Sequence, residues 1–433
     1  MQKPDFHSLL STNSVEESNE PLALTGLELK ELVSPISSEE FVDSYFSRTS
    51  LNVKGDLRKF DHIFNWDRLR QALFRGQKIL DRRYNITASF TGGEDSASSR
   101  QMTEADHNQV IELLEAGATI CITNIHMADP ALAKWAQTIR EQLNFTGTVG
   151  VNCYISPDAS GLPMHYDKRV ATTLQIAGKK RWKFSTKPAK AWPTTNEVYM
   201  EGQAAEDIGA LPPDMEFQEV ELEPGDLLCL PAGAWHSARG IGFSLALNLY
   251  FAPRNFLDQL IPLLHKFAAS NESWRGGLPV TTEQIQGDIP TSVSTYLRDR
   301  LNEFNKIVSE IAVDPEVLTI PWINSLTHSP YTGWQATPTL SIPEITIDQR
   351  FCVSTPSLRF IEFQNMLIVP CDNGVLKFPV TLAIIFQQLS STTKGFTIPD
   401  VLSWQQKPDG GSTQDELISS LKTLYINGII KKV

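Results

Sequence analysis

The stretch VNCYISPDASGLPMHYDKRVATTLQIAGKKRWKFS, residues 151–185, decides the fold class of this chain. Its short runs of β-branched, aliphatic and aromatic residues are separated by Gly, Pro and Asp, as in consecutive strands joined by turns. The same pattern covers residues 146–253 and includes MEFQEVELEPGD, LLCLPAG and FSLALNLYFAP. Successive short strands of this kind indicate an antiparallel β-sandwich or barrel.

Helical patterns flank this β-rich region, so the predicted fold class is α+β. On the N-terminal side we expect a helix with Ser38 as its N-cap, helices over 67–74 (after an Asn65 cap), 104–117 and 129–143 (with an Asp129 cap), and a strand over 118–125. On the C-terminal side we expect amphipathic helices over 255–270 and 291–312, then a Pro-rich irregular connector over 315–345. The remainder mixes helices with short strands, which is compatible with a winged-helix-like domain.

The composition limits the class of protein. With 433 residues, a formal charge of −12 and 41% hydrophobic residues, the chain has material for two or three globular domains. The acidic balance argues against a protein that mainly grips nucleic-acid phosphates. The five cysteines include no CxxC pair, so a disulfide framework or a cysteine zinc site is not expected. Without a signal peptide or a run long enough to cross a membrane, we expect a reduced, cytoplasmic protein.

One motif carries chemistry, Pro163-Met164-His165-Tyr166-Asp167. Side chains alternate along a strand, so His165 and Asp167 point to the same face and can chelate one ion. A second histidine, His236, follows the turn-rich segment EPGDLLCLPAGAW. Two histidines and one carboxylate are the ligand set of a non-heme Fe(II) site, which leaves coordination positions open for a cosubstrate and dioxygen.

Two of the cations that follow this motif in the sequence bear on its chemistry, Lys180 and Arg169. A turn at Ala177-Gly178 is expected to fold the chain back, so that Lys180 lies on a strand paired with the one after His165 and Asp167. A buried lysine beside a metal requires an anion, and the diacid 2-oxoglutarate fits. The alternative is a solvated turn lysine. Arg169 is expected to share the inward face with Asp167, where it either contacts substrate or forms a structural ion pair.

The segments NCYISPDASGLPMHYD (152–167), QIAGKKRW (175–182) and EPGDLLCLPAGAWHS (223–237) resemble the JmjC-type, cupin-fold 2-oxoglutarate oxygenases, most closely the ribosomal-oxygenase branch. The resemblance implies a double-stranded β-helix (jelly-roll) core with flanking helices, a helical dimerisation segment and a C-terminal winged-helix-like domain. The domains expected are a flexible tail over 1–25, a catalytic domain with an α/β lead-in over 26–253, a dimerisation segment over 254–314, and the connector with the C-terminal domain over 315–433.

The resemblance also implies roles for individual residues. His165, Asp167 and His236 correspond to the iron ligands, and Lys180 to the basic residue that pairs with the distal carboxylate of 2-oxoglutarate. Asn152, Tyr154 and Asn248 correspond to polar residues around the cosubstrate. The loop before His165 and the one between His236 and the Asn248 strand look shorter than in relatives, which leaves the substrate class open.

The activity implied is hydroxylation of an amino-acid side chain in a protein or peptide, with Fe(II), 2-oxoglutarate and O2, releasing succinate and CO2. A ribosomal protein and a biosynthetic precursor peptide are both compatible targets, and the −12 charge favours a basic one. We expect a homodimer. Nucleic acid is not an expected partner, because the tail lacks a recognition helix dense in Lys and Arg. The alternatives are a catalytically silent cupin that binds partners through its tail, and a metal-dependent cupin that does not use 2-oxoglutarate.

Overall fold

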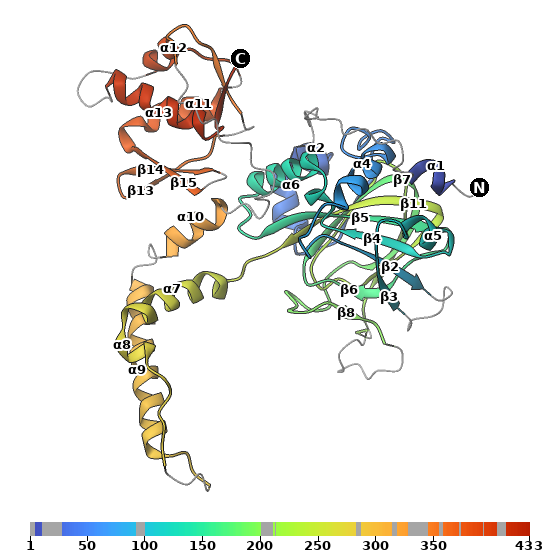
Figure 1. Cartoon of the computed structure of the whole chain (residues 1–433), viewed down its shortest axis with the longest axis horizontal. Helices are drawn as coiled ribbons and strands as arrows, with labels where there is room; N and C mark the ends of the chain where they lie inside the picture. Colours follow the sequence, from blue (N-terminus) through green and yellow to red (C-terminus); the bar gives the residue numbers. More distant parts are fainter. Residues whose placement is uncertain are drawn as a thin grey trace. The chain divides into compact units, whose positions relative to one another are not determined.

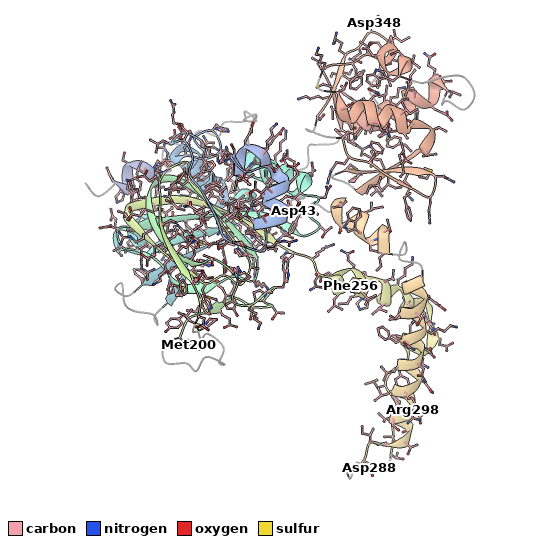
Figure 2. The ribbon with its side chains drawn as sticks, turned by 180° about the vertical axis from the view of Figure 1, so that it is seen from behind. Asp43, Met200, Phe256, Asp288, Arg298 and Asp348 are labelled. Atoms are coloured by element: carbon pink, nitrogen blue, oxygen red, sulfur yellow. The ribbon has the colours of Figure 1, made fainter. Side chains whose placement is uncertain are left out.

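The computed structural model describes residues 5–10, 28–91, 100–200, 211–212, 214–282, 287–313, 318–327, 345–354, 358–371, 374–392, 394–404 and 413–433. The chain divides into two compact units, and the boundary lies between Pro253 and Arg254. Figure 1 shows the elements of each unit, and Figure 2 adds the side chains. Each unit is described by itself.

The first unit is built around an 11-stranded sheet whose pairings are antiparallel. Its strands are β1 (Leu51–Val53), β2 (Asn85–Thr91), β3 (Arg100–Ala105), β4 (Thr119–Thr123), β5 (Thr148–Pro157), β6 (Gly161–Tyr166), β7 (Val170–Ser185), β8 (Glu197–Val198), β9 (Phe217–Leu222), β10 (Leu227–Leu230) and β11 (His236–Ala252). The main path runs β1-β10-β7-β11-β5-β4-β2-β3. The antiparallel β core predicted from residues 146–253 is therefore confirmed.

The two faces of this sheet carry different side chains. On β11, Leu245, Leu247 and Leu249 are buried in the main apolar core, beneath the helices. Because side chains alternate, Asn248 points to the opposite face, and so does Asn152, its direct partner on β5. We call this second face the inner face. A smaller apolar cluster on it contains Trp182 and Phe184.

Helices cover the outer side of the sheet (Figure 1). They are α1 (Phe6–Leu10), α2 (Leu29–Val33), α3 (Ser38–Glu40), the π-helix η1 (Phe41–Tyr45), α4 (Trp66–Gly76), α5 (Val110–Glu115), the 3-10 helix η2 (Ile125–Met127) and α6 (Pro130–Gln142). The expected caps are confirmed: the side chain of Asn65 accepts from Arg68 N–H, and that of Asp129 from Ala131 and Leu132 N–H.

Three local predictions need correction. The cap of α3 is Ser37 rather than Ser38, because the Ser37 side chain accepts from the N–H of Glu40. The helix expected over 104–117 covers only α5, since its first residues continue β3, which pairs with β2. Within the expected tail, α1 buries Phe6 and Leu10 in the main core. The rest of that tail, 1–4 and 11–25, lies outside the described residues.

The second unit contains α7 (Phe256–Ser270), α8 (Glu272–Arg275), α9 (Thr291–Val313) and α10 (Thr319–Thr327). The first and third match the two predicted helices, whereas α10 lies where an irregular connector was expected. Its C-terminal part has β12 (Phe351–Val353), β13 (Ile361–Phe363), β14 (Met366–Cys371), β15 (Gly374–Pro379), the 3-10 helix η5 (Val380–Leu382), α11 (Ala383–Ser391), α12 (Ile398–Ser403), α13 (Gln414–Ile426) and β16 (Ile430–Lys432).

The C-terminal elements share their own apolar core. Strands β13, β14 and β15 form a small antiparallel sheet, and β12 pairs with β16. The winged-helix-like assignment stays a prediction. Among the described helices of the whole chain, none combines the length and apolarity that crossing a membrane requires.

Candidate functional site

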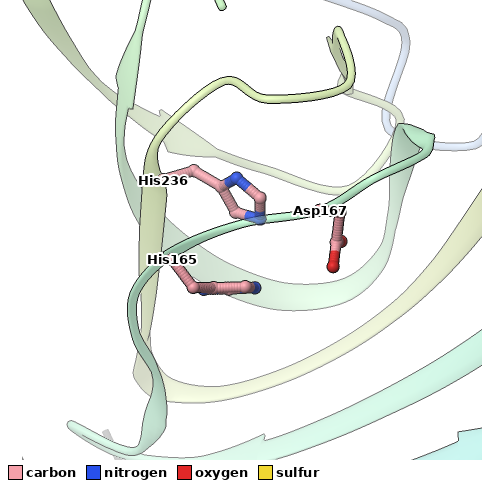
Figure 3. A group of neighbouring side chains, drawn as sticks. All are labelled: His165, Asp167 and His236. Atoms are coloured by element: carbon pink, nitrogen blue, oxygen red, sulfur yellow. The ribbon is translucent and has the colours of Figure 1, made fainter. Parts of the chain in front are cut away.

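The candidate metal site lies where β6 and β11 pair at one end of the inner face. His165 and His236 are direct partners in the antiparallel register, and their ring centroids are 4.2 Å apart. Asp167 follows the last residue of β6. One potential ligand atom from each of the three side chains lies within 4.8 Å of the others (Figure 3). The structure thus brings together the three residues predicted from the sequence.

Hydrogen bonds orient both imidazole rings. The Nδ1 atom of His165 lies 2.7 Å from the carbonyl oxygen of Pro163, and Nδ1 of His236 lies 2.9 Å from that of Ala234. A carbonyl can only accept, so each Nδ1 carries the hydrogen and each Nε2 keeps a lone pair for a metal. Burial lowers the pKa of His236 and so favours the neutral ring, and this effect outweighs the opposing charge of Asp167.

A glycine joins the two metal-site loops. The N–H of Gly233 donates to the carbonyl of Asp167 at 2.8 Å, and its own carbonyl accepts from the N–H of Ala189 at 2.9 Å. Gly233 has φ +84°, and a Cβ there would lie 2.0 Å from the carbonyl oxygen of Lys190. A larger residue would therefore displace the loop that leads into His236.

Lys180 reaches the inner face by a different route from the one predicted. No turn forms at Ala177-Gly178; β7 continues through both residues as one strand. Instead, Leu245 pairs with Ala177 and Ala246 with Gln175, so one residue of β7 bulges between them. A one-residue bulge exchanges the faces of all later side chains. Lys180 consequently shares the inner face with Phe184, the strand partner of His236.

The Lys180 side chain is a buried cation. The residue is 3% exposed, and Nζ lies 5.6 Å from the ring centroid of Tyr154 and 5.9 Å from that of Trp182. Its ammonium forms no ion pair with any residue that the structure describes. Burial lowers the pKa of Lys180 to about 8. Such a group calls for an anionic ligand.

The neighbouring cations on β7 behave differently. Lys179, Arg181 and Lys183 point outward and pair with Glu223, Glu221 and Glu219, a ladder of carboxylates on and beside β9. The Arg181–Glu221 nitrogen–oxygen distance is 3.0 Å. The alternative of a solvated side chain therefore holds for the flanking cations Lys179, Arg181 and Lys183. Of these four cations on β7, Lys180 is the one on the inner face.

The three polar residues implied by the resemblance share the inner face. Asn248 pairs with Asn152 on β5 and with Thr173 on β7. Its Oδ1 is buried without a hydrogen-bond partner in the described chain, so the side chain has an unused polar atom on this face. Asn152 Oδ1 accepts from the N–H of Asn124 at 3.0 Å. Burial raises the pKa of Tyr154, so its phenol stays protonated.

Two further residues border the site. Trp182 is 8% exposed, its ring lies 5.9 Å from the ring of His236, and its indole N–H has no partner in the described chain. Its two-residue spacing from Lys180 is the signal that could have placed it on the inner face. Asn124 has a left-handed backbone, φ 55°, and orients Asn152. Its local sequence contains no comparable signal.

Comparisons with known proteins agree with this geometry. Residues 127–258 match the family described as JmjC domain. Protein YxbC of Bacillus subtilis (strain 168) is 23% identical over 334 residues, which cover 73% of this chain and 96% of YxbC. The bifunctional lysine-specific demethylase and histidyl-hydroxylase NO66 of Drosophila mojavensis is 26% identical over 319 residues, 70% of this chain but only 33% of NO66.

A solved structure shares the fold. The ribosomal oxygenase YcfD from Escherichia coli, in complex with cobalt and 2-oxoglutarate, matches with a TM-score of 0.53 over 92% of this chain and 98% of that chain. The identity is 14%, so this likeness concerns the fold alone. Together with the JmjC match and the NO66 relative, it confirms the resemblance noted in the sequence. The chain therefore contains a JmjC domain over residues 127–258 and is similar to NO66 and, in fold, to the ribosomal oxygenase YcfD.

Proposed function

We propose that this chain is an Fe(II)- and 2-oxoglutarate-dependent oxygenase that hydroxylates an amino-acid side chain of a protein or peptide. One observation carries the proposal: the buried ammonium of Lys180, without an ion-pair partner in the described chain, shares the inner face with His165, Asp167 and His236. A set of metal-binding side chains and a buried cation on one face fit a ligand that chelates a metal at one end and is anionic at the other.

The residues present fit Fe(II) and 2-oxoglutarate. His165 and His236 offer Nε2 lone pairs and Asp167 a carboxylate, which is the facial triad of non-heme iron sites. Lys180 would hold the distal carboxylate, and the amide N–H of Asn248, on the same face, would donate to an oxygen of the cosubstrate. When bound with O2, the metal and 2-oxoglutarate supply the oxidising power and yield succinate and CO2. The chain's own residues bind and orient these groups and limit access of water to them.

The substrate class rests on the relatives. The names of NO66 and of the Escherichia coli ribosomal oxygenase indicate protein targets for those proteins. We extend this to the present chain, with a ribosomal protein or a precursor peptide as target. The alternatives of a silent cupin, or of one that does not use 2-oxoglutarate, leave Lys180 without a counter-ion.

We also propose a homodimer formed through the helical segment of the second unit. Helix α7 exposes Phe256 (62%, labelled in Figure 2) and Leu257 (56%), and α9 exposes Leu301 (67%). These exposed apolar side chains support an interface in this helical segment. For the winged-helix-like C-terminal part we propose an accessory role in protein contacts.

Two assays test the proposed activity. The protein with Fe(II), O2 and 2-oxoglutarate should form succinate, and His165→Ala should abolish it while His265→Ala, an exposed histidine of α7, should not. Incubation with ribosomal proteins and with peptide pools should add the mass of one oxygen atom to a target. Succinate formation that survives His165→Ala would remove His165 from the site. Absence of any oxygen gain across both sets would reject the protein or peptide substrate.

A further inference from the structure

Arg169 lies two residues after Asp167, immediately before the first residue of β7. Its sequence position left open a substrate contact or a structural ion pair. The guanidinium carbon lies over the ring of Tyr250, 4.0 Å from its centroid, which is a cation–π contact. Arg169 is partly buried and makes no ion pair or hydrogen bond with its side chain among the residues described. The ion-pair interpretation therefore lacks a partner there.

The ring beneath Arg169 is held in place. Tyr250 is 7% exposed, and its hydroxyl donates to Asn124 Oδ1 at 2.6 Å. Its partner on β5 is Gly150, where a Cβ would lie 2.4 Å from the Tyr250 hydroxyl oxygen. Only a residue without a side chain leaves room for the ring. Tyr250 is thus a rigid platform that limits the conformations of the guanidinium.

This platform belongs to the same face as the proposed iron site. Tyr250 and Asn248 are two residues apart on β11, and Asn248 faces Asn152. Burial raises the pKa of Tyr154, Asp167 adds to that rise, and the charge of Arg169 opposes it. Arg169 and Asp167 therefore act on the same phenol. Arg169 lies beside the site, on the side of Tyr250.

We propose that Arg169 recognises a carboxylate of the substrate next to the residue that is hydroxylated. This inference rests on the proposed function and adds a specificity to it. A guanidinium that contacts a ring through its face keeps N–H groups at its edge, where a carboxylate can accept two parallel hydrogen bonds. In the proposed function Lys180 binds the distal carboxylate of 2-oxoglutarate. Arg169, which has no ion-pair partner among the described residues, can therefore bind a carboxylate of the substrate.

The proposal refines the argument from net charge. An overall charge of −12 attracts basic targets at long range. Arg169 acts at short range, where a cationic side chain would be repelled and a carboxylate bound. The carboxylate belongs either to an internal Asp or Glu or to the C-terminus of the substrate. A basic protein or peptide with such a group beside the target residue satisfies both conditions.

A binding experiment tests this without knowledge of the substrate. The full chain, labelled with 15N-arginine and loaded with Zn(II) and 2-oxoglutarate, is titrated while the Arg169 Nε–H resonance is followed; Arg169→Lys assigns it. N-acetyl-aspartate N-methylamide represents an internal acidic residue, and N-acetylglycine a C-terminus. We expect a saturable shift with at least one, and about tenfold weaker binding of N-acetyl-asparagine N-methylamide. No shift, or equal shifts with the aspartate and asparagine probes, would overturn the proposal.

Variants separate this inference from the proposed function. Arg169→Gln should bind the aspartate and asparagine probes with equal affinity, measured by how far each probe stabilises the loaded protein against thermal unfolding. Its affinity for 2-oxoglutarate should stay within about twofold of the wild-type value. Arg181→Gln, which removes an outward cation paired with Glu221, should change neither. Loss of 2-oxoglutarate affinity in Arg169→Gln alone would make Arg169 a cosubstrate residue and contradict the proposal. A wild-type protein that binds no 2-oxoglutarate would instead reject the proposed function, while the Arg169 titration could still be read with metal alone.

Discussion

His165 and His236 are directly paired residues of antiparallel strands, and each donates its Nδ1 hydrogen to the carbonyl two residues earlier in the chain. The two imidazoles therefore have the same tautomer, and their ring planes are tilted by 54° to one another. A metal placed between them meets two Nε2 lone pairs without a change of tautomer. This preorganisation supports a metal site more strongly than the His-x-Asp motif does alone.

Divalent metal should stabilise the wild-type protein and not the histidine variant. Because metal binds only the folded site, Mn(II) at about a hundred times its Kd should add about 2.7 kcal/mol to the free energy of unfolding. In His236→Ala this gain should disappear. Thermal unfolding with and without Mn(II) measures it, and His265→Ala is the matched control. Equal stabilisation of wild type and His236→Ala would place the metal elsewhere.

The KM for 2-oxoglutarate should rise with pH above about 8, the pKa to which burial lowers Lys180. The reason is that the ammonium loses its proton as pH passes this value, and with it the attraction for the distal carboxylate. Each further pH unit should raise KM about tenfold until binding no longer depends on the charge. Lys180→Arg keeps its charge over this range and should remove the dependence. A KM that stays constant from pH 7 to pH 9.5 in the wild type would contradict this role.

His126 should make the fold sensitive to acid. Burial lowers its pKa to about 4, and its Nδ1 accepts from the N–H of Val151 at 3.0 Å. Between this value and its ordinary pKa of about 6.5, the unfolded chain binds a proton that the folded chain does not, so stability falls as pH decreases. The contribution is about 2 kcal/mol between pH 7 and pH 5. Urea unfolding of wild type and His126→Gln at pH 7 and pH 5 gives the free energy of unfolding at each pH. The loss between the two pH values should be smaller in the variant, and an equal loss would exclude His126 as the cause.

The buried pair of Arg68 and Asp129 should be sensitive to removal of one charge. Arg68 Nε donates to Asp129 Oδ2 at 3.0 Å, and both residues are buried. Asp129→Asn keeps an N-cap for α6 but leaves a buried cation unpaired, which costs about 3–5 kcal/mol. Glu221→Gln, in the exposed pair with Arg181, should cost far less. Similar losses in the two variants, measured by urea unfolding, would show that burial of the first pair does not matter.

Local chemistry made much of this fold predictable. The caps Asn65 and Asp129 depend only on a few adjacent residues, and the strand pattern of residues 146–253 depends on side-chain type. The His-x-Asp spacing likewise places two side chains on one face whatever the partner strand. The structure agrees with these predictions because none of them requires knowledge of distant contacts.

Other features depend on long-range pairing. The bulge between Gln175 and Ala177 is defined by its register against β11, and the local sequence suggested a turn instead. The left-handed Asn124 matters because it meets Asn152 and Tyr250 from strands distant in sequence. Helix α5 begins late because residues before it pair with β2. In each case a partner far along the chain decides the conformation.

An anaerobic titration tests the central claim, that one inner face binds both a metal and 2-oxoglutarate. Fe(II) and 2-oxoglutarate are added to the protein, and the weak visible charge-transfer band of the chelate is followed. We predict a saturable band in the wild type and in Lys179→Met, whose outward side chain pairs with Glu223, and at least tenfold weaker binding of 2-oxoglutarate in Lys180→Met. A wild-type protein that binds Fe(II) but shows no band, or a Lys180→Met variant that matches Lys179→Met, would contradict the account.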